Sequence, residues 1–517
     1  MSNKPNRMTM SVRNAKVSLF FYFAMLVVNI VSRKLFIDYL GDTLTGLTTT
    51  MQYTVGLLNM ADMGIVTAIS CALFTPIYND DKYEIQRIIS LFNYLFKIVG
   101  TAIIAVGGIL VFLMPLFIDE DIENKTIYLS FLTFLFTTSL SYFVNYKQQI
   151  LMASQRTYVV TAIQNTVILC KIFSQMAIVY YVPVGEGAYY YWLLAEAVSA
   201  LIHSLMIEIK VRYDYPWLKP SFQEGYAIRK EYKPLFKSLK QIVSHKFANV
   251  ILTQTDSLVI ANVISLVTVT YYYNYTMIIS KLLTFVGSAF SGSWASVGNL
   301  ISENDKEKIK SVFYQYNSIV MFLAGVLCLC VYLLADPFIT AWIGEEYVLG
   351  KGIFVFMVVS LYVAIMRIPL TVFLTGYTLY KDTWSAWLEA GLNLVISIYG
   401  SIHYGLIGVV LGTTVSTFVV TFLWKPYFLY ANGFKINVGG YYKEQAKFIL
   451  PLLALYYLSN FYVEQYVVDN CNTLVDFFIF AVVLSVSISV VYGLMVYALS
   501  KSFRKISNDF LRRTFKR

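Results

Sequence analysis

Charged side chains are scarce in this chain, which argues against an ordinary soluble protein. Of its 517 residues, 14% are Asp, Glu, Lys or Arg, whereas soluble domains average about 25%. Hydrophobic residues make up 58% of the sequence. This balance is typical of a protein that is surrounded by lipid rather than by water.

Histidine and cysteine are also rare, and they form no pattern of a catalytic or metal site. The three histidines are scattered, and the five cysteines lie mostly in apolar stretches without metal-ligand spacing. The sequence has no phosphate-binding glycine loop, no histidine box, and no serine or cysteine nucleophile beside a base. It therefore predicts a protein that is not an enzyme, with no metal site and no cofactor.

Near-continuous apolar segments run from about residue 17 to about residue 500. A helix needs roughly 20 mostly apolar residues to cross a bilayer, and backbone inside a bilayer must satisfy its own hydrogen bonds. The segments are therefore expected to be helices, about fourteen in number. The predicted fold class is an all-α polytopic membrane protein.

The charges at the two ends predict that both termini are cytoplasmic. Four bases and no acid occur in residues 1–16, and seven bases occur against one acid in residues 501–517. Positive segments stay on the cytoplasmic side, so the number of spans is even. Residues 210–246 and 425–447 are predicted to be basic cytoplasmic loops. These segments account for the net charge of +10, and no nucleic-acid partner is expected.

The sequence is predicted to repeat at an offset of 224 residues. Residues 79–85, Asn-Asp-Asp-Lys-Tyr-Glu-Ile, match residues 303–309, Glu-Asn-Asp-Lys-Glu-Lys-Ile, and small residues precede both loops. Chance similarity between two loops is the simpler alternative. With six spans in each repeat the halves run parallel, and such halves hold the substrate between them. We expect two pseudo-symmetric six-helix lobes and two additional helices. The N-terminal lobe covers 1–215 and the C-terminal lobe covers 238–430, with a cytoplasmic linker over 216–237 between them. The two additional helices and a basic tail cover 431–517.

Ionisable residues inside the predicted spans are the main candidates for a functional site, because an ion in lipid is costly unless it faces water or a partner. Five bases are candidates for binding an anionic substrate in a cavity: Arg33, Lys97, Lys171, Lys281 and Arg367. Three acids are candidates for ion coupling or gating: Asp62, Asp256 and Glu389. Glu196 is a further acid within a span.

Arg367 is the strongest of these candidates because it lies about mid-span, just before Pro369. A guanidinium binds planar oxyanions through two hydrogen bonds and resists deprotonation, which suits an anionic substrate. For Lys97 the alternative is a side chain that reaches the interface. For Asp62 the alternative is a buried acid paired with a neighbouring lysine.

Several short motifs resemble the polysaccharide flippases of the Wzx type. The first half carries Phe36-Ile37, Leu40-Gly41, Gly46-Leu47, Ala61-Asp62-Met63-Gly64-Ile65 and Pro76-Ile77-Tyr78. The second half carries Thr255-Asp256-Ser257-Leu258-Val259-Ile260-Ala261, Tyr275, and Ser296-Val297-Gly298-Asn299. Arg33 and Asp256 match recurrent positions of that family.

This family belongs to the multidrug/oligosaccharidyl-lipid/polysaccharide (MOP) exporter superfamily. The resemblance implies two lobes that face a central cavity and work by alternating access in the bacterial cytoplasmic membrane. It implies a polyprenyl-diphosphate-linked oligosaccharide as substrate, moved from the inner to the outer leaflet for O-antigen, capsule or another surface polysaccharide. Other polysaccharide assembly proteins, such as a polymerase and a chain-length regulator, are the implied partners.

Two other functions compete with a flippase. A drug or cation antiporter of the MATE kind is the first, but a cation pocket is expected to be rich in acids, and the charges in the spans are richer in bases. A membrane enzyme such as a polymerase or ligase is the second, but the predicted outside loops are short. The sequence does not distinguish proton from sodium coupling, and it does not identify the glycan.

Overall fold

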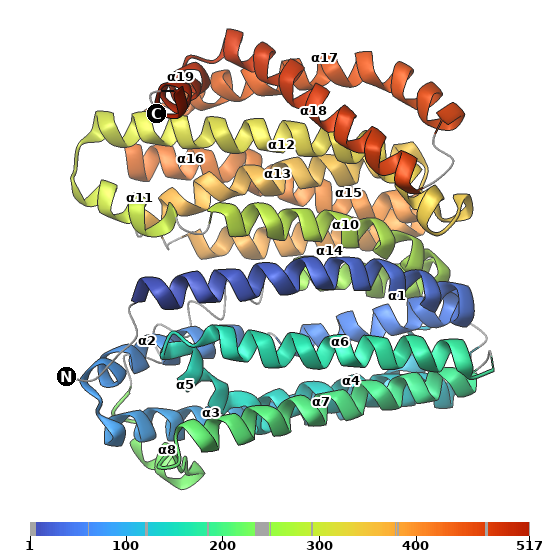
Figure 1. The fold of residues 1–517 in the computed structure, drawn as a ribbon, viewed down its shortest axis with the longest axis vertical. Helices are drawn as coiled ribbons and strands as arrows, with labels where there is room; N and C mark the ends of the chain where they lie inside the picture. Colours follow the sequence, from blue (N-terminus) through green and yellow to red (C-terminus); the bar gives the residue numbers. More distant parts are fainter. Residues whose placement is uncertain are drawn as a thin grey trace. The chain divides into compact units, whose positions relative to one another are not determined.

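The computed structural model contains helices and no strands in the part of the chain that it describes (Figure 1). It describes the backbone of residues 7–59, 62–118, 122–183, 186–232, 248, 250–290, 293–377, 379, 382–470 and 474–515. Side chains are described in these ranges except at residues 7–12, 15, 62–64, 67–68, 70–71, 186, 293–295, 460–470, 474–476, 510–511 and 513–515. The predicted all-α class is confirmed.

The chain divides into two compact units, residues 1–270 and 271–517. The helix Val250–Val263 and the first residues of α10 therefore group with the first unit. Two hydrogen bonds help to hold them there. The Thr270 hydroxyl donates to the carbonyl oxygen of Asp42 at 2.7 Å, and Asn262 Nδ2 donates to the carbonyl oxygen of Phe117 at 3.3 Å.

The first unit is a bundle of long helices with short connections. Its elements are α1 (Arg7–Leu58), α2 (Asp62–Asn79), α3 (Lys82–Leu113), α4 (Asn124–Phe143), α5 (Gln148–Ala153), α6 (Thr157–Tyr181), α7 (Glu186–Asp214), α8 (Phe222–Ile228) and the helix Val250–Val263. Gly41 interrupts α1 with a φ of 80° and a ψ of 172°. Only glycine adopts such a conformation at little cost, so Gly41 divides α1 into two helical stretches.

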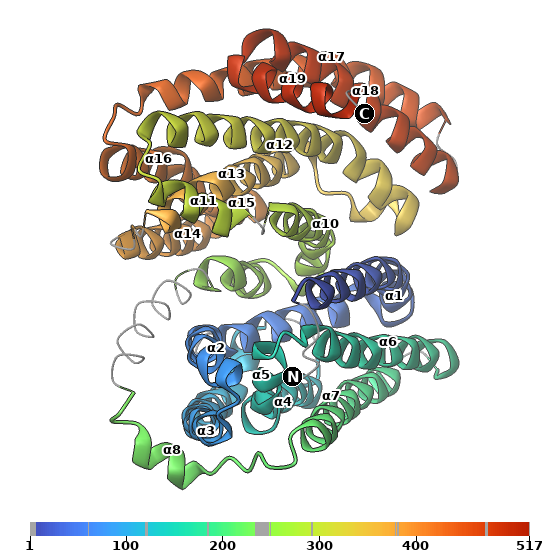
Figure 2. The ribbon, with the colours of Figure 1, turned by 60° about the vertical axis from the view of Figure 1, so that its left-hand side comes forward.

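The second unit begins within α10 (Leu266–Phe290) and contains the remaining helices. They are α11 (Ser293–Ser302), α12 (Lys306–Trp342), α13 (Lys351–Gly376), α14 (Thr383–Tyr404), α15 (Leu406–Thr417), α16 (Lys425–Leu429), α17 (Gly439–Asn470), α18 (Leu474–Leu499) and α19 (Lys501–Phe515). The helices α17 and α18 pack along α12 (Figure 2). These are the two added helices that the sequence predicts after the second lobe.

Nine helices in the described part of the chain are long and apolar enough to cross a membrane. They are Lys16–Leu58, Lys82–Leu116, Asn124–Phe143, Thr157–Tyr181, Gly187–Asp214, Lys306–Trp342, Lys351–Gly376, Leu406–Phe434 and Phe477–Leu499. The first of these contains the break at Gly41. Helices also cover the predicted span centres Val250, Leu282, Leu392 and Leu455, so the structure is compatible with about fourteen spans.

The predicted 224-residue repeat has a counterpart in local structure. Asp80 has a φ of 57° and Asn304, at the equivalent position, has a φ of 58°. The next residue caps the following helix in both copies: Asp81 accepts from the Glu84 amide at 2.9 Å, and Asp305 accepts from the Lys308 amide at 3.1 Å. The helices that follow, α3 and α12, start at equivalent positions. The two loops therefore share one turn and one cap, and the repeat of six spans stays a prediction.

Small residues bring α14 and α15 into close contact. A Cβ atom added to Gly408 would lie 2.0 Å from the carbonyl carbon of Gly400, and one added to Gly412 would lie 2.1 Å from the Ser397 hydroxyl. Close approach of membrane helices through small residues is a common form of packing. It fixes the position of Glu389 on α14 relative to the residues that follow α15.

The predicted linker begins with a segment that docks on α3. Ser90 donates to Glu224 on α8 at 2.6 Å, and Arg87 forms an ion pair with Glu231. A Cβ atom on Gly225 would lie 2.1 Å from the carbonyl oxygen of Ser90, so only glycine permits this contact. Residues 233–237 lie outside the described part of the chain.

The prediction of a cytoplasmic loop over residues 425–447 is wrong for most of that range. Helical backbone continues from α16 through residues 430–434, and α17 begins at Gly439. Residues 435–438 are the non-helical part. Bases led to the loop prediction, but Lys425 points into the unit rather than into water, with a side chain that is 14% exposed.

Candidate functional site

An ion pair joins two of the predicted site residues in the second unit. Arg367 on α13 pairs through Nη2 with Glu389 on α14, and its Nε donates to the Thr421 hydroxyl at 2.9 Å. The Glu389 side chain is 4% exposed and the Arg367 side chain is 25% exposed. A buried carboxylate requires such a counter-charge. The guanidinium therefore neutralises Glu389 while part of its own surface stays accessible.

A second ion pair lies beside the first. Lys425 Nζ is 3.7 Å from Asp382 Oδ2, and Trp424 Nε1 donates to Asp382 Oδ1 at 2.6 Å. Lys425 lies close enough to Arg367 and Glu389 to interact electrostatically with both. The four side chains are two bases and two acids. We call Arg367, Glu389, Asp382 and Lys425 the charge cluster.

Lys171 belongs to a different ion pair, in the first unit. Its Nζ lies 2.9 Å from Glu196 Oε1, which joins α6 to α7. Gln175 Nε2 donates to Glu196 Oε2 at 3.1 Å. The two charged side chains are 17% and 13% exposed, and the pair is neutral as a whole.

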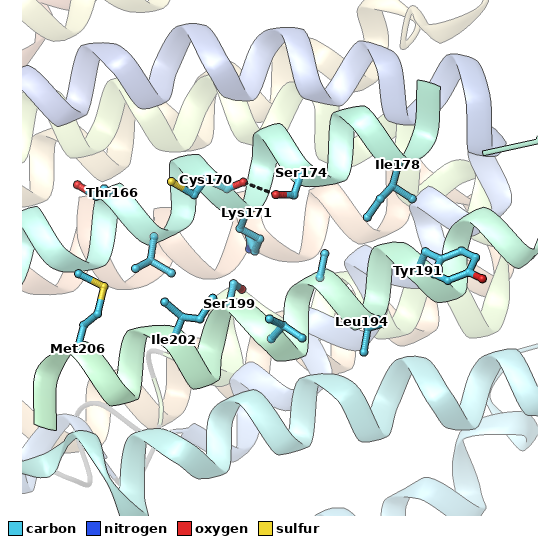
Figure 3. A pocket seen from close by; sticks show the side chains of 13 residues that line it. Thr166, Cys170, Lys171, Ser174, Ile178, Tyr191, Leu194, Ser199, Ile202 and Met206 are labelled. Atoms are coloured by element: carbon cyan, nitrogen blue, oxygen red, sulfur yellow. Dashed lines mark hydrogen bonds between the residues drawn. The ribbon is translucent and has the colours of Figure 1, made fainter. Parts of the chain in front are cut away.

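A groove runs between α6 and α7, and Lys171 is one of the residues that line it (Figure 3). Its volume is about 510 Å³. Apart from Lys171 and Tyr191 the walls are apolar or carry small hydroxyl and thiol groups, and they include Cys170, Ser174 and Leu194. The helices α6 and α7 are both candidate spans. The groove is therefore largely apolar, and Lys171 is the charged residue among those that line it.

Arg33 lies on α1 and approaches the start of α10. Its Nη2 is 3.5 Å from the carbonyl oxygen of Thr270, and its side chain is half-buried. Nearby on α1, a Cβ atom added to Gly46 would lie 1.9 Å from the carbonyl oxygen of Leu266. The backbones of α1 and α10 therefore meet on the side that the charge pattern predicts to be outside the cell.

The other predicted site residues lie on helices that do not contribute to the charge cluster. Asp256 is 6% exposed on the helix Val250–Val263, in the first unit. Lys97 Nζ lies 5.7 Å from the centre of the Phe222 ring, near the docked linker. Lys281 is half-buried on α10. The Asp62 side chain lies outside the described residues.

Sequence reasoning missed two members of the charge cluster and the pairing within it. Asp382 and Lys425 lie near the ends of their helices, where a charge predicts a loop. Among the described residues, no group of three or more His, Cys, Asp and Glu is arranged to hold a metal ion.

No protein-family model matches the sequence, and no curated protein matches it. Solved structures do match the fold. The lipid II flippase MurJ in an inward closed conformation superimposes with a TM-score of 0.61 at 14% identity, over 94% of this chain and 99% of the flippase.

Two transporters match over a smaller share of the chain. An inward-facing multidrug resistance MATE family transporter of the MOP superfamily gives a TM-score of 0.55 at 16% identity, over 81% of this chain and 98% of the transporter. A MOP superfamily transporter from Pyrococcus furiosus, described as having a binding pocket of reverse polarity, gives 0.50 at 14% identity, over 84% and 98%. The chain therefore has the fold that the MurJ flippase and the MATE transporters share.

Proposed function

We propose that this protein is a flippase for a lipid-linked oligosaccharide. It moves polyprenyl-diphosphate-linked repeat units from the inner to the outer leaflet of a bacterial cytoplasmic membrane by alternating access, for O-antigen, capsule or a related surface polysaccharide. The main support is the fold likeness to a lipid II flippase, which extends over 94% of the chain. The MATE family transporter matches 81%.

In this proposal Arg367 binds the diphosphate. Its guanidinium is held by Thr421 and Glu389 but remains 25% exposed. A diphosphate offers oxygen pairs that fit the two-pronged donor geometry of arginine. When Glu389 is protonated, its ion pair with Arg367 is lost, and the diphosphate replaces Glu389 as the partner of Arg367. When the substrate leaves, Glu389 releases the proton and pairs with Arg367 again.

This exchange makes Glu389 the coupling acid of a proton-driven cycle. The carboxylate gains one proton as Arg367 gains the diphosphate, so the proton offsets one of the two negative charges that the diphosphate brings. Asp256 is a second buried acid that suits sodium or proton coupling in the first unit. The remaining bases, Arg33, Lys97 and Lys281, are proposed contacts for the phosphates or for acidic sugars.

A MATE-like cation or drug antiporter is the alternative. Its support is the fold likeness at a TM-score of 0.55 and the burial of Asp256. Increased tolerance to cationic dyes, lost in Asp256→Asn, is the result that this alternative predicts. A flippase predicts no change in tolerance.

Depletion of the protein in its own cell tests the proposal. We expect lipid-linked repeat units to accumulate with their sugars facing the cytoplasm, and surface polysaccharide to decline. Normal surface polysaccharide without accumulation after depletion contradicts it. A polymerase would instead leave single repeat units exposed on the outer leaflet, so the sidedness of the accumulated material separates these two functions.

A further inference from the structure

The C-terminal helix α19 has the charge distribution of a helix that lies on a membrane surface. Half-buried residues recur at Phe503, Ile506 and Ser507, which is the spacing of one helix face. Exposed bases occupy other positions, at Lys501, Lys505 and Arg512. The segment from 501 to 517 carries seven bases and one acid. None of the functions proposed for the transport cycle uses this helix.

The position of α19 along the membrane normal is set by α18. The candidate span Phe477–Leu499 ends directly before Ser500, and α19 begins at Lys501. Ser500 caps the new helix by accepting from the Phe503 amide at 3.2 Å. The basic helix therefore starts where the hydrocarbon region ends, at the level of the lipid headgroups.

Side-chain contacts fix the direction of α19. Arg504 donates to the carbonyl oxygens of Tyr497 at 3.1 Å and Ala498 at 2.7 Å, and so satisfies the end of α18. Tyr497 donates to Asn508 Oδ1 at 2.9 Å, and the Phe503 ring lies 5.0 Å from the Phe322 ring of α12. Figure 1 shows α19 nearly end-on, whereas α12 and α18 run across the view. The helix lies crosswise to the spans of its unit.

We propose that α19 is an interfacial anchor that binds anionic phospholipid headgroups of the cytoplasmic leaflet through Lys501, Lys505 and Arg512. Its apolar side rests on α12 and α18, and its exposed bases lie at headgroup level. Basic side chains of an in-plane helix attract anionic lipids at about 1 kcal/mol each, or roughly fivefold in affinity per residue. Arg504 is engaged with α18 and serves to position the helix.

The test uses the full-length protein in nanodiscs of phosphatidylcholine, with or without phosphatidylglycerol. We expect hydrogen exchange in residues 501–512 to slow when phosphatidylglycerol is present. Exchange that is the same in both lipids overturns the proposal. It is also the result expected if the bases bind a soluble acidic protein instead.

A matched pair of variants gives the second measurement. The variant Lys501→Gln/Lys505→Gln/Arg512→Gln removes three charges from α19. The control Lys219→Gln/Lys230→Gln/Lys306→Gln removes three exposed lysines elsewhere in the chain and has the same net charge. We expect retention of phosphatidylglycerol, measured by native mass spectrometry, to weaken on the order of a hundredfold in the first variant. Equal retention by the two variants overturns the proposal.

Discussion

Arg367 and Glu389 form an ion pair across α13 and α14 in which the acid is almost fully buried and the base is partly accessible. In the proposed function the accessible guanidinium binds the substrate, and the buried carboxylate holds the guanidinium in place. This arrangement is the basis of the exchange that we propose for transport.

The first prediction separates structural from functional roles of Arg367. Arg367→Met alone leaves Glu389 buried without its partner and is expected to destabilise the protein by about 3–5 kcal/mol. The double variant Arg367→Met/Glu389→Leu is expected to recover most of that stability, because both charges are gone. We expect it to lack transport at normal abundance. Thermal unfolding in detergent and flipping in proteoliposomes measure the two effects, and normal flipping by the double variant contradicts a substrate role for Arg367.

The second prediction uses the Lys171–Glu196 pair as a matched control. Its two side chains are 17% and 13% exposed, so its base is less accessible than Arg367, which is 25% exposed. Lys171→Met/Glu196→Leu is expected to keep both stability and most transport activity. Loss of transport in this stable double variant would place Lys171 on the substrate route.

The third prediction concerns proton coupling through Glu389. Glu389→Gln removes the charge while keeping the shape of the side chain, and it leaves Arg367 without its negative partner. We expect tighter binding of the lipid-linked diphosphate and flipping that no longer responds to an imposed pH gradient. Flipping that retains its full response to the gradient would transfer the coupling role to another acid, such as Asp256.

The fourth prediction concerns the contact between α1 and α10. A side chain at Gly46 would overlap the carbonyl oxygen of Leu266, so Gly46→Val is expected to separate the two helices and to reduce transport at least tenfold. Gly108→Val is the control. It also replaces a helical glycine by valine, but a Cβ atom at Gly108 meets nothing within 4 Å. Equal activity of the two variants would show that this close approach is not needed for the cycle.

The fifth prediction concerns the docked linker. Gly225→Val places atoms against the carbonyl oxygen of Ser90 and is expected to release α8 from α3. Limited proteolysis is then expected to cut residues 216–232 faster than in the unchanged protein. Gly287→Val on α10, where a Cβ atom meets nothing within 4 Å, is the control. An unchanged cutting rate in Gly225→Val would mean that the linker stays docked by its side-chain contacts alone.

Much of the architecture could be predicted because it follows from local physical requirements. Long apolar segments in a bilayer require helices. The two matching loops could be predicted because a turn with positive φ, followed by an aspartate that caps a helix, requires particular residues. Asp80-Asp81 and Asn304-Asp305 meet that need at equivalent positions. Such requirements act within a few residues of each other, so a sequence shows them directly.

The pairing of the charged residues could not be predicted in the same way. Arg367 and Glu389 are on different helices, and the rotation of each helix about its axis is set by packing. The close contact of α14 with α15 fixes that rotation through backbone proximity, which a single sequence does not reveal. The prediction that Lys425 lies in a loop is wrong for a related reason. A base near the end of an apolar segment predicts a loop, and the sequence alone does not show that Lys425 pairs with Asp382.

The most direct test of the account is a flipping assay with the purified protein in proteoliposomes. The substrate is a fluorescent polyprenyl-diphosphate oligosaccharide, and its exposure to an added sugar-modifying reagent reports the leaflet. We predict that the protein speeds the exchange of this lipid between leaflets well above protein-free vesicles, and that Arg367→Met/Glu389→Leu does not. Exchange at the protein-free rate, with a correctly folded protein in the vesicles, would contradict the account.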